Sequence, residues 1–409
     1  MKSGQYHSGK PLLRRHQQPP DPPSSCSCKT VLLCLSALIL FSKFFLFPSR
    51  RSYPPLVLPP GCNLSQGEWV PDLEGPLYTN DTCFTIQEHQ NCLKWGRPDR
   101  DFLRWKWKPA GCDLPRFDPV WFLSLVTGKS IVFIGDSLAR NQMQSLMCLI
   151  SSVERPQDLS DGKSENFKRM FFPRHRLTIA IYWSPFLINA HLIDNDGPNH
   201  TGLWNLFLDE VDPTWYAQLR RYDLVVIADG NWFTRPSLFF ENRRLVGCHF
   251  CHRPNVTDLT LRYSHRAAFR TALAAINRLA ASGQFTGTVF VRSFSPAHFE
   301  GGEWNSGGNC RRRRPYRANE THLQPLDQEF YDHQLEEFRA ATAAGGGAKM
   351  RLLDTTAAML LRPDGHPSRY GHSAHDAVAM YNDCVHWCLP GPVDTWNQLL
   401  FAMLAQESS

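Results

Sequence analysis

Short apolar runs alternate with longer amphipathic stretches along the chain from about residue 113 onward. Five runs rich in Val, Ile and Phe predict buried strands: 130–134, 177–182, 223–228, 288–294 and 350–353. Between them, 140–151 and 264–281 repeat Ala, Leu and Phe at helical spacing and predict helices with one buried face. This alternation predicts a three-layer α/β/α domain, in which helices cover both faces of a mainly parallel sheet.

The preceding segment, residues 61–112, has a different pattern. It carries four cysteines and four tryptophans with little periodicity, which predicts a loop-rich module held by disulfides. Ten of the 13 cysteines lie beyond residue 48, and this even number suits an oxidising compartment. Farther along, the Ala and Gly tract 340–348 predicts a flexible surface loop.

Near the N-terminus, residues 30–47 form an apolar stretch in which Lys43 is the only charge. As a helix it would be about 27 Å long, enough to cross a thin membrane. Basic residues dominate the preceding tail, so the positive-inside rule predicts a cytosolic N-terminus and a lumenal remainder. The alternative, a cleaved signal peptide, would have an unusually long basic region and lacks an Ala-x-Ala cleavage site.

These patterns divide the chain into consecutive parts. We expect a cytosolic tail at 1–29, a single transmembrane anchor at 30–47, a proline-rich stalk at 48–60, the Cys/Trp-rich module at 61–112 and the catalytic domain at 113–409. All five N-glycosylation sequons follow the predicted anchor: Asn63, Asn80, Asn199, Asn255 and Asn319. The net charge of +6 is modest and partly reflects the cluster at 311–314, so it gives little support to a nucleic-acid partner.

The first candidate catalytic residue is Ser137, in the run IVFIGDSLARNQ. A predicted strand ends there and turns at Gly135 into a predicted helix, so the serine would be exposed at the carboxyl edge of the sheet, near helix N-terminal amides. Taken alone, Gly-Asp-Ser is a weak signal, because most such tripeptides are ordinary helix N-caps.

The second constellation lies near the C-terminus, in NDCVHWCLPG. Asp383 and His386 are three residues apart, so on a single turn the carboxylate can orient the imidazole. His386 would then take the proton of Ser137, whose hydroxyl is otherwise a poor nucleophile at neutral pH. The alternative is a disulfide-rich turn between Cys384 and Cys388 with a bystander histidine.

Gly-Asp-Ser combined with Asp-x-x-His resembles the SGNH (GDSL-like) hydrolase superfamily. The longer strings GDSLARNQMQSLMCL, FSPAHFEGGEWNSGGNC, RPDGHPSRYG and DCVHWCLPGPVDTWN, with GCNLSQGEWVPDLEGPLYTNDTC, resemble the plant trichome-birefringence-like family of polysaccharide O-acetyltransferases. The resemblance covers about residues 61–403. The string LKWGRPDRDFLRWKWKPAGCDLPRFDP is most similar to the branch that contains xyloglucan and mannan acetyltransferases.

This resemblance implies roles for individual residues. Ser137 would accept the acyl group, Asp383 and His386 would complete the triad, and Arg140 would order the nucleophile turn or assist the oxyanion site. Asn231 is the candidate oxyanion asparagine, although its surroundings depart from the usual Gly-x-Asn-Asp form and a turn-forming role is the alternative. The family-like disulfides would be Cys62–Cys112, Cys83–Cys148, Cys92–Cys388 and Cys310–Cys384.

The resemblance also implies the reaction and its surroundings. A Golgi membrane enzyme of single-pass type II topology would transfer acetyl from a donor, acetyl-CoA or another lumenal carrier, to a hemicellulose hydroxyl, with xyloglucan as the expected acceptor and mannan or xylan as alternatives. No bound cofactor is expected, and the oligomeric state stays open. Two rival functions remain: a carbohydrate esterase using the same triad, and a non-catalytic wall-polysaccharide-binding protein.

A His/Asp cluster and a cysteine pair are interpreted as structural. Asp364, His366, His372 and His375 match no standard zinc spacing, so no metal site is expected there. Cys248 and Cys251 could form a redox pair, but an oxidising lumen favours a local structural bridge.

Overall fold

A seven-stranded sheet forms the centre of the computed structural model, which describes residues 53–162, 166–194, 202–345, 347–378 and 380–407. Its strand order is β13-β12-β9-β3-β6-β5-β4. The strands from β13 to β6 pair in parallel, and β5 and β4 extend the sheet in antiparallel orientation. The strands are β3 Ser130–Gly135, β4 Gln157–Asp158, β5 Phe167–Phe172, β6 Leu177–Trp183, β9 Leu224–Ala228, β12 Thr288–Arg292 and β13 Lys349–Leu353.

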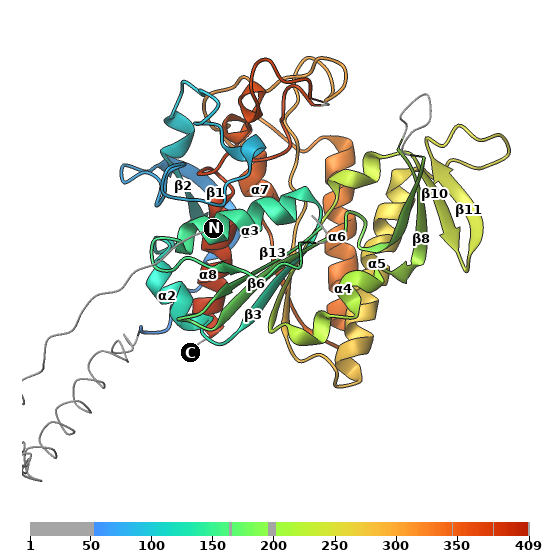
Figure 1. The fold of residues 1–409 in the computed structure, drawn as a ribbon, viewed down its shortest axis with the longest axis horizontal. Coiled ribbons are helices and arrows are strands. Elements are labelled where there is room, and N and C mark those ends of the chain that lie inside the picture. The colour runs from blue at the N-terminus through green and yellow to red at the C-terminus, as the bar shows by residue number, and fades with distance from the viewer. Residues whose placement is uncertain (1–52, 163–165, 195–201, 346, 379, 408–409) are drawn as a thin grey trace, which may run out of the picture. The chain divides into compact units, whose positions relative to one another are not determined.

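Helices cover both faces of this sheet (Figure 1). Along β3, Ile131 and Phe133 pack into the core shared with α3 and α8, whereas Val132 and Ile134 pack into the core shared with α5. A parallel strand buried on both faces needs such continuous apolar residues, and the predicted α/β fold is confirmed. The helices are α2 Pro119–Leu125, α3 Ser137–Ile150, α4 Pro213–Tyr216, α5 Thr260–Ala281, α6 Pro325–Ala343, α7 Thr356–Leu360 and α8 Asp394–Glu407.

A second, four-stranded sheet was not predicted from the sequence. Its order is β11-β10-β8-β7, and Leu206 and Leu208 of β8 join a core cluster with Ala268 of α5. Its strands carry many polar residues and lack strict alternation, so their pattern is weak. The strands are β7 Ile188–Asp194, β8 Leu203–Val211, β10 Ser237–Glu241 and β11 Arg244–His249.

Helix α6 corrects one prediction from the sequence. It continues to Ala343 and so includes the first part of the tract 340–348, which was expected to be a loop. Alanine has the highest helix propensity, and Thr342 supports the last turn by donating its hydroxyl proton to main-chain carbonyls. The helix ends where the glycines begin.

The Cys/Trp-rich module is built on an antiparallel pair, β1 Asn63–Pro71 and β2 Trp105–Ala110. The rings of Trp69 and Trp107 pack edge to face at 5.8 Å. The indole N–H of Trp69 donates to the carbonyl of Ala358, 289 residues away at α7. The module is therefore joined to the catalytic domain through a shared core.

Five disulfides connect the described residues. The pairs Cys62–Cys112, Cys83–Cys148, Cys92–Cys388 and Cys310–Cys384 are those implied by the family resemblance. The fifth, Cys248–Cys251, is the local bridge expected for that pair. The ten cysteines beyond residue 48 are thus all paired.

The predicted tail 1–29, anchor 30–47 and first part of the stalk lie outside the described residues. Within the described part of the chain, no helix combines the length and the apolar character needed to cross a bilayer.

We predict that the disulfides differ in their effect on stability. Cys92–Cys388 joins residues 296 apart, whereas Cys248–Cys251 spans only three. Because a crosslink stabilises mainly by restricting the unfolded chain, replacing both cysteines of the first pair by serine should lower the free energy of unfolding by about 2–5 kcal/mol. The matched change at Cys248 and Cys251 should cost less. Denaturant unfolding would check this, and equal losses would contradict it.

Candidate active site

The Ser137 side chain lies where β3 passes into α3. β3 ends at Gly135, where φ is +146° and a Cβ atom would collide with the carbonyl of Ala228 on β9. Only glycine allows the two strands to approach this closely. Asp136 caps α3 by accepting a 2.8 Å hydrogen bond from the main-chain N–H of Leu138, so Ser137 begins the helix.

The catalytic candidates form a continuous hydrogen-bonded chain. Nε2 of His386 lies 2.7 Å from Oγ of Ser137, and Nδ1 lies 2.7 Å from Oδ2 of Asp383. Oδ1 of Asp383 also accepts the main-chain N–H groups of Val385 and His386 at 3.0 and 2.9 Å. The carboxylate therefore fixes both the turn and the imidazole, with Nδ1–H donating to Asp383 and Nε2 facing the serine.

Asp383 and His386 each stabilise the charged form of the other. Burial by itself would raise the pKa of Asp383, but the nearby His386 and its hydrogen bonds hold that pKa well below the ordinary value. For His386 burial acts to lower the pKa, and the Asp383 carboxylate more than reverses this, so the pKa of the imidazole is raised. A buried base whose protonated form is stabilised by a carboxylate is suited to taking a proton from serine.

A buried network lies behind the nucleophile. Oδ2 of Asp136 accepts a 3.3 Å hydrogen bond from the main-chain N–H of Asn231, in the turn that follows β9. Burial raises the pKa of Asp136, and burial together with the charge of Asp136 raises that of Asp229. Arg292 is buried beside them, and burial lowers its pKa to about 10. One carboxylate thus holds the Ser137 turn and the Asn231 loop together.

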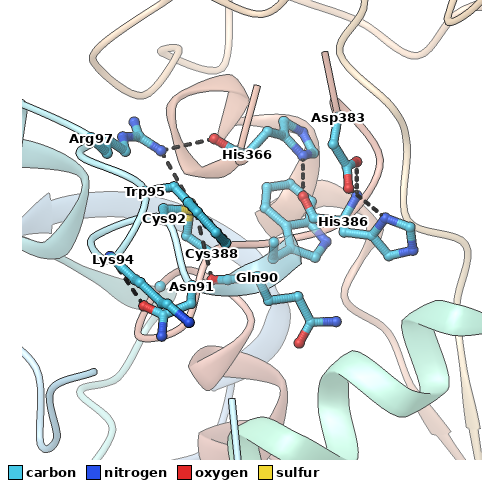
Figure 2. The surroundings of a disulfide bond; sticks show 12 residues. Gln90, Asn91, Cys92, Lys94, Trp95, Arg97, His366, Asp383, His386 and Cys388 are labelled. Atoms are coloured by element: carbon cyan, nitrogen blue, oxygen red, sulfur yellow. Dashed lines mark hydrogen bonds and ion pairs between the residues drawn. A yellow bond between two sulfur atoms is a disulfide. The ribbon is translucent and has the colours of Figure 1, made fainter. Parts of the chain in front are cut away.

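A second histidine, His366, contacts the main chain of the catalytic turn 383–388 (Figure 2). Nδ1–H of His366 donates to the carbonyl of His386 at 2.7 Å, and the His366 ring stacks on Trp387. Nδ1 of His298 lies 2.7 Å from Nε2 of His366, and Nε2 of His298 lies 3.0 Å from the Leu360 carbonyl oxygen. Neither histidine was predicted to support the site.

The Cys/Trp-rich module contributes to the same region. The Arg97 guanidinium donates to the carbonyl of His366 at 2.8 Å, and Cys92 is bonded to Cys388 (Figure 2). The ring of His89 lies edge-on to His386, with centroids 5.1 Å apart. Burial, followed by the charge of His386, lowers the pKa of His89 to about 4, so this second imidazole is neutral at neutral pH.

The structure brings all five predicted catalytic and positioning residues to this edge of the sheet. Arg140 lies one turn after Ser137 on α3, and its charge acts to lower the pKa of both His89 and His386. Asn231 is half-buried at the start of its turn. The residues whose part in the site was not predicted from the sequence are His89, Asp136, Asp229, Arg292, His298 and His366. The place of Asp136 in the Gly-Asp-Ser motif was the clearest available signal.

The discounted His/Asp cluster is dispersed. Asp364 forms a buried ion pair with Arg362, and His372 contacts main-chain carbonyls of its own loop. Among the described residues, no group of three His, Cys, Asp or Glu side chains is arranged to hold a metal ion. Of the five sequons, Asn63, Asn255 and Asn319 are exposed, Asn80 is half-buried, and Asn199 lies outside the described residues.

We predict that the buried histidines weaken the fold in acid. Burial lowers the pKa of His298 to about 4, whereas an unfolded histidine titrates at about 6.5. The unfolded chain therefore binds more protons between these values, and stability present above pH 6.5 is lost as the pH falls toward 4. At 1.36 kcal/mol per pKa unit, His298 accounts for on the order of 3 kcal/mol of this loss.

Unfolding measured at several pH values would check this prediction. His298→Asn removes the titrating ring and should flatten the decline, whereas His322→Ala, at an exposed histidine, serves as the control. An unchanged pH dependence in His298→Asn would show that this residue does not titrate as described.

Comparison with known proteins gives the same assignment across almost the whole described chain. Residues 114–403 match the GDSL/SGNH-like acyl-esterase family found in Pmr5 and Cas1p, and residues 60–113 match the PMR5 N-terminal domain. The chain is 52% identical to Protein trichome birefringence-like 19 of Arabidopsis thaliana, over 85% of this chain and 81% of that protein.

Two further relatives have names that state an activity. Xyloglucan O-acetyltransferase 2 of Arabidopsis thaliana is 42% identical over 85% of this chain and 83% of its own length. Xyloglucan O-acetyltransferase 4 of Populus trichocarpa is 43% identical over 84% of this chain and 81% of its own length. With its Gly-Asp-Ser turn and Asp-x-x-His turn joined in one hydrogen-bonded site, the chain belongs to the GDSL/SGNH-like acyl-esterase family found in Pmr5 and Cas1p, among its trichome-birefringence-like members.

Proposed function

We propose that this protein is a polysaccharide O-acetyltransferase that transfers acetyl through Ser137 to a hydroxyl of xyloglucan. The observation that carries the proposal is the Ser137–His386–Asp383 hydrogen-bonded chain in a protein whose relatives include several xyloglucan O-acetyltransferases. The relatives at 52% and 48% identity have names that state no acceptor. The choice of xyloglucan therefore rests on the relatives at 42% and 43% identity whose names state xyloglucan.

The geometry supports a two-step reaction. Oγ of Ser137 attacks the acetyl carbonyl of the donor while Nε2 of His386 takes the hydroxyl proton, and the donor's leaving group departs with that proton. In the second step His386 removes the proton of a sugar hydroxyl, whose oxygen attacks the acetyl-serine. The sugar keeps the acetyl group, and His386 returns the proton to Ser137.

The oxyanion that forms in each step needs donors. We assign the main-chain N–H of Ser137 and the Asn231 side chain to this role, because Asp136 holds the two segments in contact. The donor is a co-substrate, acetyl-CoA or another acetyl carrier. Water in place of the sugar would give an esterase from the same triad, so the ratio of transfer to hydrolysis separates these two functions.

The protein's location belongs to the same proposal. A basic tail, an apolar stretch at 30–47 and five following sequons support a single-pass type II protein of the Golgi membrane. The five disulfides suit an oxidising lumen. The catalytic domain would then meet polysaccharide before secretion.

We predict that Ser137→Ala and His386→Ala each lower the transfer rate by about 10⁴-fold or more, and Asp383→Ala somewhat less, because the three residues act as one relay. The double variant Ser137→Ala/His386→Ala should be little worse than either single variant. Ser124→Ala, at an exposed serine on α2, is the control. Rates would be measured by acetyl transfer to xyloglucan, mannan and xylan oligosaccharides. Near-normal transfer by purified Ser137→Ala would exclude the covalent route.

The topology gives a separate prediction. Glycosidase treatment of the full-length protein should lower its mass, because sequons in the lumen are glycosylated. Protease added to intact microsomes should remove only the short N-terminal tail. An unglycosylated protein whose triad domain is digested in intact vesicles would place Ser137 in the cytosol and contradict the proposed location.

A further inference from the structure

Two loops are joined to the Ser137 site, one to the nucleophile turn and the other to the catalytic turn. One follows β9 and runs from Asn231 to Arg235, held to the nucleophile turn by Asp136. The other is the glycine-rich loop 300–309, closed at its base by paired main-chain hydrogen bonds between Glu300 and Asn309. We call these the 231 loop and the 300 loop.

The 300 loop is tied to the catalytic turn. The next residue, Cys310, is bonded to Cys384, which follows Asp383 directly. In addition, the amide of Asn382 donates to the Gly308 carbonyl at 3.0 Å. The loop therefore has a fixed position relative to the triad, even though its tip is exposed.

Aromatic and guanidinium groups connect the two loops. The Arg235 guanidinium lies 5.0 Å from the Trp232 ring centroid and 5.3 Å from that of Trp304, an exposed residue of the 300 loop. Trp183 packs edge to face on Trp232 at 5.0 Å and pairs with Gly135 across the sheet. A row of flat side chains thus runs from the strand beside Ser137 to the protein surface.

Trp304 is a large hydrophobic side chain exposed on the 300 loop. The side chain is 41% exposed, although it lies in a loop clamped next to the triad. Neither the catalytic relay nor the apolar cores involve this tryptophan. An indole held by a guanidinium, rather than buried, presents an apolar face and nearby hydrogen-bond donors to solvent, the pairing that suits a sugar ring with apolar faces and a hydroxyl rim.

We propose that Trp304, Arg235 and Trp232 form a platform that binds the pyranose backbone of the acceptor polysaccharide and leads it to Ser137. The choice of ligand rests on the proposed function. The platform would bind at least one sugar residue beyond the one that is acetylated, and would thereby help to select long acceptors over short ones.

The carboxylates near the platform offset the attraction that the Arg235 guanidinium would exert on the acetyl donor's polyphosphate. Glu303 directly precedes Trp304. Burial, followed by the charge of Glu303, raises the pKa of Asp327 to about 6. Carboxylates beside the platform would repel phosphate groups. Neutral hydroxyl groups carry no such penalty and can accept hydrogen bonds from Arg235.

Equilibrium binding of a xyloglucan oligosaccharide to the full-length protein, without acetyl donor, tests the platform. Trp304→Ala should raise the Kd about tenfold, the scale of a central contact in an interface. Trp304→Phe keeps a smaller aromatic face and should lose less. Arg235→Lys keeps the charge without the flat guanidinium and should also weaken binding. Phe250→Ala, at an exposed aromatic residue after β11, is the matched control and should bind as the unaltered protein does.

The competing occupant is tested with coenzyme A as the second probe. Loss of coenzyme A binding in Trp304→Ala with unchanged oligosaccharide binding would overturn the proposal and identify a donor site. Unchanged oligosaccharide binding in Trp304→Ala, or an equal loss in Phe250→Ala, would also overturn it. The binding test is separate from the acetyl-transfer assay. An oligosaccharide that binds through Trp304 but is not acetylated in the transfer assay would contradict the proposed function and still support the platform.

Discussion

The site depends on one hydrogen bond, between Nε2 of His386 and Oγ of Ser137, which joins groups 249 residues apart in the chain. Neither group can hold this position alone, since a serine hydroxyl rotates freely and a histidine on a surface turn has several rotamers. Much of the fold acts to fix the two ends. The sheet and α3 place Ser137, and the disulfides and buried side chains around 383–388 place His386.

The N-terminal module helps to hold His386 in position. His366 contacts both the His386 carbonyl and the Trp387 ring of the catalytic turn, and Cys92 of the module is bonded to Cys388. Arg97 of the module in turn binds the carbonyl of His366. Catalytic groups need a supporting shell of this kind, because small displacements in a proton relay cost large factors in rate. The module therefore belongs to the active-site structure.

The sequence predicted the parts of the molecule with strong local patterns. The central strands β3, β6, β9 and β12 contain continuous apolar runs, β13 has a shorter one, and their shared carboxyl edge was where the catalytic residues were expected. The second sheet was missed because its strands β8 and β10 mix polar with apolar residues and are defined by packing on α5. The His298–His366 pair joins two loops 68 residues apart without periodicity, so only the folded chain could reveal it.

In the proposed mechanism, acetyl passes through Ser137. Rapid quenching of the full-length protein with acetyl-CoA, without acceptor, followed by peptide mass spectrometry, measures this directly. We expect an acetyl group on the peptide that contains Ser137, which disappears when xyloglucan oligosaccharide is added, and no such group in Ser137→Ala. Transfer that proceeds at its full rate while Ser137 is never acetylated would contradict it.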